Sequence, residues 1–562
     1  MKIFNLIYKT IGQILFVIIF FSTLSAKPLD KFYEGDSLSD YFSGILLLNN
    51  NQYELSVKHL KKLNGLENNH IDYSIKYLYS LVNSGNLREA FNYSKKLEKQ
   101  GKDNFESHLI SGIFYLKNSN IDLAQKYFQK AKNKDQGSII NKYLSNSLYN
   151  WSKLSNLSQS IIDLKKLDKR FENFKKIQNI FLHCYFESPN TDILFTKLTS
   201  NRNTDFSRYN YFHALYLTSI GLTDKAKEIT KSALKINPRN LLLNHYNYYL
   251  DEYRNISSFN CQQERDVVAE ILYITANAFS SQTIYPLSNF YLNLAKYLNK
   301  DFLSYETLLA ENFYNIENFK IAKKIYKKLS KFGEAFNWYS SKQIARILIK
   351  EEKQNEALNL LNKSYTNLKN KELYETFDYA EFLKNNEKFK DSIPFYTKIL
   401  MQIKKDHPLY TEVTDGRGVA YERIGEWSKA EKDLLASLEV NPDQAYVINY
   451  LAYSWIEQGI KIDKSLSMLK KANKLRSNDP YITDSLGWAL FKLERFKEAK
   501  EYLQLAVSLL PADPIVNDHY GDALWKNGNE IQARYYWNYV LNLEKTEDEQ
   551  KKIIRNKLIK GL

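Results

Sequence analysis

The chain has 562 residues, 44% of them hydrophobic, so it can build a long packed core. Its 10 prolines and 18 glycines are too few for an all-β protein, which needs many turns, or for a Pro/Gly-rich disordered chain. The formal net charge is +15, but residues 420–562 hold 21 basic and 21 acidic residues, so the excess lies in 1–419. It forms no dense run of Lys and Arg, which argues against a nucleic-acid partner.

Residues 1–26 are organised like a secretory signal peptide. Lys2 and Lys9 precede an apolar run over 11–24, and small residues follow it. The run is shorter than the roughly 20 residues that span a bilayer. No cysteine lies near the expected cleavage site, so a lipid anchor is not predicted. We expect export to the periplasm, with an uncleaved inner-membrane anchor as the alternative.

Small side chains recur at a constant interval through residues 27–238. They occupy the same place in successive 34-residue units at Ser56, Ala90, Ala124 and Ser158. The unit near 173–206 is degenerate, and 239–270 fits no unit, which predicts an irregular helical joint there.

The two cysteines, Cys184 and Cys261, are too few for a disulfide framework. They could pair in an oxidising compartment, but 77 residues separate them, and two buried, unreactive thiols are the expected state. No His/Cys cluster has the spacing of metal ligands, so neither a metal nor a cofactor is expected.

The interval continues through residues 271–403 and is clearest in 404–547, ahead of a helical tail at 548–562. Small residues fall at positions 8, 20 and 27 of each unit, and proline often falls near position 32. One unit shows the full set: Gly487, Ala499, Ala506 and Pro511. This is the pattern of the tetratricopeptide repeat (TPR), a helical hairpin whose small residues lie where helices cross. The predicted fold is all-α, a TPR α-solenoid forming a right-handed superhelix of about 12–14 hairpins.

In this repeat, positions 2, 5, 9, 12 and 13 of the first helix are expected to face a concave groove. The predicted groove residues are Tyr446, Asn449, Tyr453, Tyr481, Asp484, Trp488, Phe491, Asp518, Asp522 and Trp525. Aromatic side chains bury area at low entropic cost, and carboxylates or carboxamides hold a peptide backbone or basic side chains. The alternative is that the aromatics only cover helix junctions. Position 5 holds no lysine (it is Asp415 in an earlier repeat), so capture of acidic C-terminal peptides is not expected.

Three strings carry a resemblance: NYLAYSWIEQG, ITDSLGWALFKLERFKEA and VNDHYGDALWKNGNEIQA. Over about residues 445–562 they resemble the C-terminal signature of a TPR family of Gram-negative bacteria, notably α-proteobacteria. Its distant relatives include an outer-membrane TPR lipoprotein that binds a periplasmic C-terminal processing protease and delivers cell-wall hydrolases to it. The resemblance implies an adaptor for a periplasmic protease or cell-wall enzyme. The chain lacks that relative's acylated cysteine, so outer-membrane anchoring is not implied.

No nucleophile-elbow, zinc-protease, phosphate-loop or dinucleotide motif is present, and the eight histidines are scattered. We therefore expect a non-catalytic periplasmic scaffold or adaptor that binds a protein or extended peptide in its concave groove, in envelope or cell-wall maintenance. No small-molecule substrate and no nucleic acid are expected, and membrane contact is expected only through an uncleaved N-terminal segment. Two alternatives are a TPR module of an exopolysaccharide synthesis or export complex, and a membrane-anchored basic solenoid that binds nucleic acid.

Overall fold

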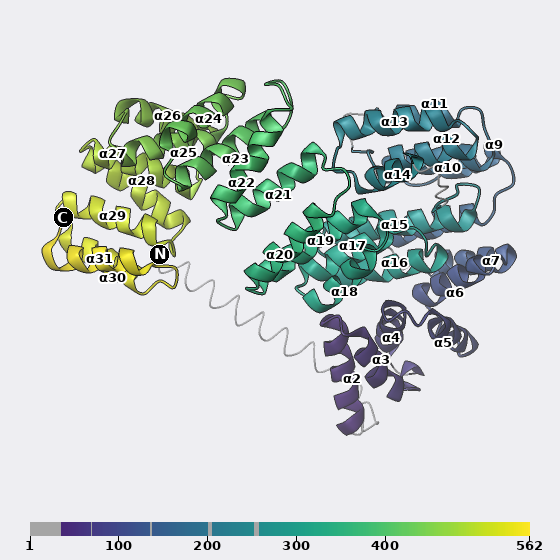
Figure 1. The fold of residues 1–562 in the computed structure, drawn as a ribbon. Coiled ribbons are helices and arrows are strands. Elements are labelled where there is room, and N and C mark those ends of the chain that lie inside the picture. The colour runs from purple at the N-terminus through teal and green to yellow at the C-terminus, as the bar shows by residue number, and fades with distance from the viewer. Residues whose placement is uncertain (1–34, 69, 135–137, 201–204, 252–257) are drawn as a thin grey trace. The chain divides into compact units, whose positions relative to one another are not determined.

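The protein is helical throughout the part of the chain that the computed structural model describes (Figure 1). The described residues are 35–68, 70–134, 138–200, 205–251 and 258–562. The predicted signal peptide, 1–26, lies outside them. Within the described ranges there is no strand, and none of the helices combines the length and apolar character needed to cross a membrane.

The chain divides into two compact units, Met1–Ile347 and Leu348–Leu562, with the boundary inside α19. The α-helices up to that boundary are α2 (Gly35–Asn49), α3 (Tyr53–Lys62), α4 (Ile71–Asn83), α5 (Leu87–Lys99), α6 (Phe105–Lys117), α7 (Ile121–Asn133), α8 (Ile139–Trp151), α9 (Leu157–Lys165), α10 (Glu172–Tyr185), α11 (Thr191–Thr199), α12 (Tyr209–Ser219), α13 (Thr223–Ile236), α14 (Leu241–Asp251), α15 (Glu264–Ser281), α16 (Tyr285–Leu298), α17 (Ser304–Asn315), α18 (Phe319–Leu329) and α19 (Glu334–Lys350). Two 3₁₀ turns, η1 (Leu66–Asn68) and η2 (Lys169–Phe171), connect helices of this unit.

The helices of the second unit continue the series of hairpins. They are α20 (Gln354–Thr366), α21 (Leu373–Asn385), α22 (Phe389–Leu400), α23 (Tyr410–Arg423), α24 (Trp427–Val440), α25 (Ala445–Glu457), α26 (Ile462–Leu475), α27 (Pro480–Lys492), α28 (Phe496–Leu509), α29 (Pro514–Lys526), α30 (Glu530–Leu541) and α31 (Asp548–Lys560). From α20 to α31, each helix packs on the next in sequence. The predicted subdivision of the repeats at 239–270 and after residue 403 rests on repeat register and stays a prediction.

The predicted small residues lie where paired helices cross. Ala90, Ala124 and Ala499 are fully buried. A Cβ atom on Gly487 would lie 2.6 Å from Cγ of Leu503 on the partner helix, so that crossing admits only a glycine without adjustment. The predicted all-α solenoid of helical hairpins is confirmed.

The first unit fills its own concave face. Its α15 and α16, which we call the inner hairpin, pack against first helices from earlier repeats: α16 on α4 and α6, and α15 on α8. Tyr79 and Asn83, at groove positions 9 and 13 of α4, contact Phe290 edge-on (ring centroids 4.8 Å apart) and Asn293 (Asn293 Nδ2 to Asn83 Oδ1, 3.2 Å). The sequence did not predict this closure, because repeat periodicity describes only contacts between neighbours.

Buried polar contacts fix the inner hairpin in place. Arg208, just before α12, makes a two-pronged ion pair with Glu270 of α15, with both N–O distances 2.9 Å. Asn289 of α16 accepts from Asn312 Nδ2 at 2.8 Å and donates to Tyr53 Oη at 3.3 Å. Since Glu270 and Asn289 are fully buried, these partners offset the cost of removing polar groups from water.

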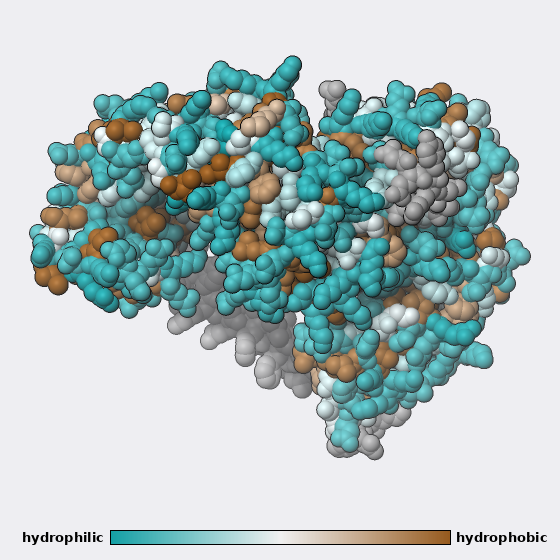
Figure 2. All heavy atoms as spheres, viewed as in Figure 1, coloured by the Kyte–Doolittle hydropathy of each residue, from teal (hydrophilic) through white to brown (hydrophobic). Residues whose placement is uncertain are grey.

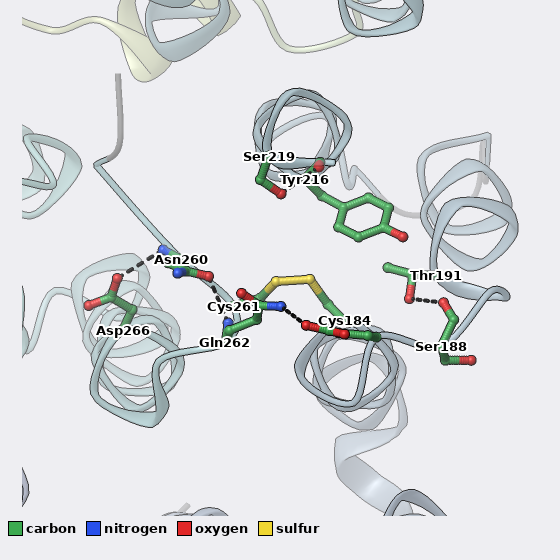
Figure 3. The surroundings of a disulfide bond; sticks show 10 residues. Cys184, Ser188, Thr191, Tyr216, Ser219, Asn260, Cys261, Gln262 and Asp266 are labelled. Carbon is green, nitrogen blue, oxygen red and sulfur yellow. Dashed lines mark hydrogen bonds between the residues drawn. A yellow bond between two sulfur atoms is a disulfide. The ribbon is translucent and has the colours of Figure 1, made fainter. Parts of the chain in front are cut away.

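A disulfide joins Cys184, at the end of α10, to Cys261, just before α15 (Figure 3). The two Cα atoms are 5.9 Å apart, a separation typical of a disulfide. Both cysteines are buried, as expected, but the prediction of two unbonded thiols was wrong. The separation of 77 residues along the chain is bridged because the segment leading into α15 returns to the end of α10, where Gln262 Nε2 also donates to Glu187 (2.6 Å).

Candidate functional site

The first helices of the last repeats expose a row of apolar side chains in the second unit. Tyr446 of α25, Tyr481 of α27 and Ile515 of α29 all occupy repeat position 2 and are 52%, 56% and 52% exposed. Tyr446 is held in place by its hydroxyl, which donates to Asp479 (2.9 Å), and by Arg476 over its ring (4.6 Å to the centroid). Because each residue stands one repeat from the next, the row follows the axis along which the repeats stack.

Other predicted groove aromatics are buried between helices. Trp488 is only 8% exposed; its ring stacks on His519 (centroids 3.9 Å apart) and Phe491 (4.9 Å), and its Nε1 donates to Glu457 at 2.6 Å. Tyr453 is half-buried against the same core, and burial raises its pKa well above the usual range. These side chains join neighbouring first helices, which is the helix-covering role given above as the alternative.

Asp484, at position 5 of α27, forms a buried ion pair with the next first helix. Nδ1 of His519 on α29 lies 2.9 Å from its Oδ2 and 3.1 Å from its Oδ1. Burial alone would lower the pKa of His519, but the charge of Asp484 and its hydrogen bond outweigh burial, and the net pKa is raised. Asp484 therefore favours the protonated form of His519.

The helical tail covers the last repeat. Lys557 of α31 places its Nζ 2.6 Å from Asp518 and 2.8 Å from both oxygens of Asp522. Asp522 also accepts from the indole of Trp537 at 3.0 Å. Burial and the neighbouring Asp518 raise the pKa of Asp522, and Lys557 opposes them. These two carboxylates thus have a partner within the chain.

Trp525 is also covered from the tail. A Cβ atom on Gly561, which follows α31 and has a positive φ of 76°, would lie 2.1 Å from Cζ2 of the Trp525 ring. Arg534 lies over the same ring, 4.5 Å from its centroid. Three of the ten predicted groove residues therefore face α31 and its end rather than open solvent.

Two position-5 side chains lack such partners. Asp415 of α23 makes no hydrogen bond or ion pair with any described residue, and burial raises its pKa to about 6. In α25, the Oδ1 atom of Asn449 is buried without a hydrogen-bond partner among the described residues. Asp415 was not among the predicted groove residues, although its place 34 residues before Asn449 identifies it. The aromatic neighbours that marked the later repeats are absent around it, since positions 2 and 12 there are Glu412 and Glu422.

Among the described residues, no cluster of three or more His, Cys, Asp and Glu side chains is arranged to hold a metal ion. On the face drawn in Figure 2, hydrophilic residues cover most of the surface and hydrophobic residues gather in small groups. The second unit thus has an exposed apolar row and, beside it, two polar side chains without hydrogen-bond partners among the described residues. This arrangement suits an extended chain better than a small molecule in an enclosed pocket.

Comparison with known proteins supports the repeat pattern from α17 to α30. Residues 308–546 match the family described as tetratricopeptide repeat. The chain is 28% identical over 177 residues to the TPR repeat-containing protein PA4667 of Pseudomonas aeruginosa, and this match spans 31% of the chain and 29% of that protein. Among solved structures, MamA from Desulfovibrio magneticus RS-1 is similar at 16% identity over 31% of this chain and 97% of that chain, with a TM-score of 0.28. MamA of AMB-1 is similar at 20% identity over 31% and 99%, with a TM-score of 0.27. Scores this low carry no information on function.

Proposed function

We propose that this chain, whose residues 308–546 match tetratricopeptide repeats, is a non-catalytic periplasmic scaffold that binds an extended segment of a protein along the second unit. TPR arrays are scaffolds for protein interaction, and their concave faces form the binding surface. The single observation that carries the proposal is the exposed row of Tyr446, Tyr481 and Ile515. The corresponding face of the first unit is already filled by the inner hairpin, so the second unit is the place for a partner.

The disulfide supports the periplasmic location. Disulfides form and persist in oxidising compartments and are rare in the bacterial cytosol. Cys184 and Cys261 are both buried at their bond, which is the situation of a structural crosslink. Together with the signal-like sequence of residues 1–26, this favours an exported protein. The resemblance of the C-terminal repeats adds a partner class, a periplasmic protease or cell-wall enzyme.

Site-specific photo-crosslinking in cells tests the groove. A photoreactive phenylalanine analogue replaces Tyr481, and a matched control replaces Tyr535, which is 68% exposed on the second helix α30. We expect Tyr481 to capture one or a few envelope proteins that Tyr535 does not. Identical captures from both positions, or none from Tyr481, would show that the row is not a binding surface.

Fractionation and sequencing of the mature N-terminus test the compartment. We expect a soluble periplasmic protein that begins close to residue 27 and carries an oxidised Cys184–Cys261 bond. Recovery of the chain in the cytosol with both thiols reduced would defeat the proposed location while leaving the groove to its own test.

A further inference from the structure

The later repeats show which kind of side chain binds the residue at position 5 of the first helix. In the last two full repeats this position is Asp484 and Asp518, and each is paired with a basic side chain from the first helix that follows. His519 of α29 approaches Asp484 to 2.9 Å, and Lys557 of α31 approaches Asp518 to 2.6 Å. The chain itself therefore shows a position-5 carboxylate satisfied twice by a basic side chain from the next layer.

The same position in α23 receives nothing from its next layer. The residue of α25 that corresponds to His519 is Tyr450, and its hydroxyl donates to Glu422 at 2.6 Å instead of reaching Asp415. The cation that acts most on the pKa of Asp415 is Lys384 of α21. Its Nζ instead donates to both oxygens of Glu381, at 2.9 Å each. Asp415 is left as a half-buried carboxylate that forms no ion pair of its own with the described residues, an arrangement that costs stability.

Position 5 of α25, Asn449, also lacks a partner among the described residues. The buried Oδ1 of Asn449 has no donor among the described residues, whereas most buried polar atoms have at least one. Tyr446 lies one helical turn from Asn449 on the same helix and is half exposed. A donor at Asn449 would therefore lie beside an apolar side chain packed on Tyr446.

We propose that α23, α25 and α27 bind an extended segment that places a lysine or arginine on Asp415 and a backbone N–H on Asn449. This inference rests on the proposed function and names the partner's chemistry. The segment's cation takes the part that His519 and Lys557 take in the later repeats. Glu412 and Glu422, at positions 2 and 12 of α23, add negative charge beside Asp415, so the site attracts a basic chain and repels an acidic one.

The repeat spacing sets the spacing of the ligand's side chains. Packed helices lie about 8–10 Å apart, and an extended chain advances about 3.3–3.6 Å per residue, so one repeat corresponds to about three residues. A basic residue on Asp415 would thus be followed, in either chain direction, by apolar residues about three and six positions away on Tyr446 and Tyr481.

Selection from a displayed library of random nine-residue peptides on the full-length protein tests the proposal. We expect the bound peptides to be enriched in Lys or Arg with apolar residues three and six positions away. Selection on Asp415→Asn should lose the basic residue and keep the apolar ones. A control, Glu501→Gln, removes one charge from the exposed face of α28 and should change nothing.

The affinity of one selected peptide then measures how much its basic residue contributes to binding. Replacing its basic residue with norleucine should weaken binding to the wild-type protein about 10- to 150-fold, because a charged hydrogen bond contributes about 1.5–3 kcal/mol. The same replacement should change the affinity for Asp415→Asn less than about twofold.

Three outcomes would overturn the inference. They are a selection without enrichment of basic residues, an enrichment that survives in Asp415→Asn, and a norleucine peptide that binds wild type as tightly as its parent. If such peptides still lose binding on Tyr481→Ala, the groove of the proposed function stands and only its basic preference falls. If no peptide is selected and photo-crosslinking at Tyr481 captures nothing, both fall together.

Discussion

Asparagine substitutions at Asp484 and Asp415 should move stability in opposite directions, although both residues occupy position 5 of a repeat. Asp484 is the counter-charge of buried His519. Asp415 forms no ion pair with the described residues, and partial burial raises the pKa of its carboxyl group. The same substitution at equivalent positions therefore distinguishes a carboxylate that stabilises the fold from one that destabilises it.

The structure sets the size of each effect. Asp484→Asn removes the charged partner of buried His519, and breaking a buried pair costs about 3–5 kcal/mol. Raising the pKa of Asp415 from 3.8 to about 6 makes its ionised form about 3 kcal/mol less favourable at neutral pH. Asp415→Asn removes that charge, so it should stabilise the second unit by up to about 3 kcal/mol.

Urea unfolding followed by tryptophan fluorescence measures both changes. Five of the seven tryptophans lie in residues 348–562, so the signal reports mainly on the second unit. At pH 7.5 we expect the midpoint of Asp415→Asn above that of the wild type and the midpoint of Asp484→Asn below it. A lower midpoint for Asp415→Asn, or an unchanged one for Asp484→Asn, would refute the reasoning.

The pH dependence gives a second check. The pKa of Asp415 is raised in the folded state. Its destabilising effect is therefore fully present above about pH 6 and disappears as pH falls towards 3.8. The advantage of Asp415→Asn should vanish with it. The pKa of His519 is also raised, so the stability it contributes is complete below about 6.5 and is lost as pH rises through its folded pKa. In Asp484→Asn that loss at alkaline pH should be much reduced.

Three further substitutions test the packing. Replacing Cys184 and Cys261 with serine should destabilise the first unit by about 4 kcal/mol, since the bond closes a loop of 77 residues; unchanged hydrogen exchange in α10 and α15 would contradict this. Arg208→Met should cost about 3–5 kcal/mol because it leaves Glu270 buried and unpaired, and the double methionine variant should recover most of the thermal stability. Gly487→Ala should lower the melting temperature of the second unit by an amount equivalent to about 1–3 kcal/mol, as its new methyl group enters a filled crossing.

The sequence predicted the features that depend on neighbouring helices. Gly487 and Ala499 are small because two helices cross there, and that requirement repeats every 34 residues whatever the rest of the chain does. The same local reasoning identified position 5 as a polar row. It could not say which of these carboxylates have partners. The histidines, His519 among them, looked scattered, and Lys557 lies in the predicted helical tail.

The closure of the first unit was beyond such reasoning. Asn83 and Asn293 are 210 residues apart in sequence yet share a hydrogen bond. Cys184 and Cys261, 77 residues apart, are likewise brought together by a return of the chain that contacts between neighbouring helices do not describe. Curvature arises from small rotations at each repeat, and no single residue pattern encodes their sum.

The inner hairpin also dictates when the first unit can finish folding. An open array can begin at any repeat and grow outward, but here α4 and α6 stay incomplete until α16 emerges, because Lys117 donates to the carbonyl of Leu298, 181 residues later. Such distant pairings slow folding. During synthesis from the N-terminus, the aromatic faces of these helices would stay exposed to solvent until about half of the chain had been made. A chain truncated before α16 would never cover them.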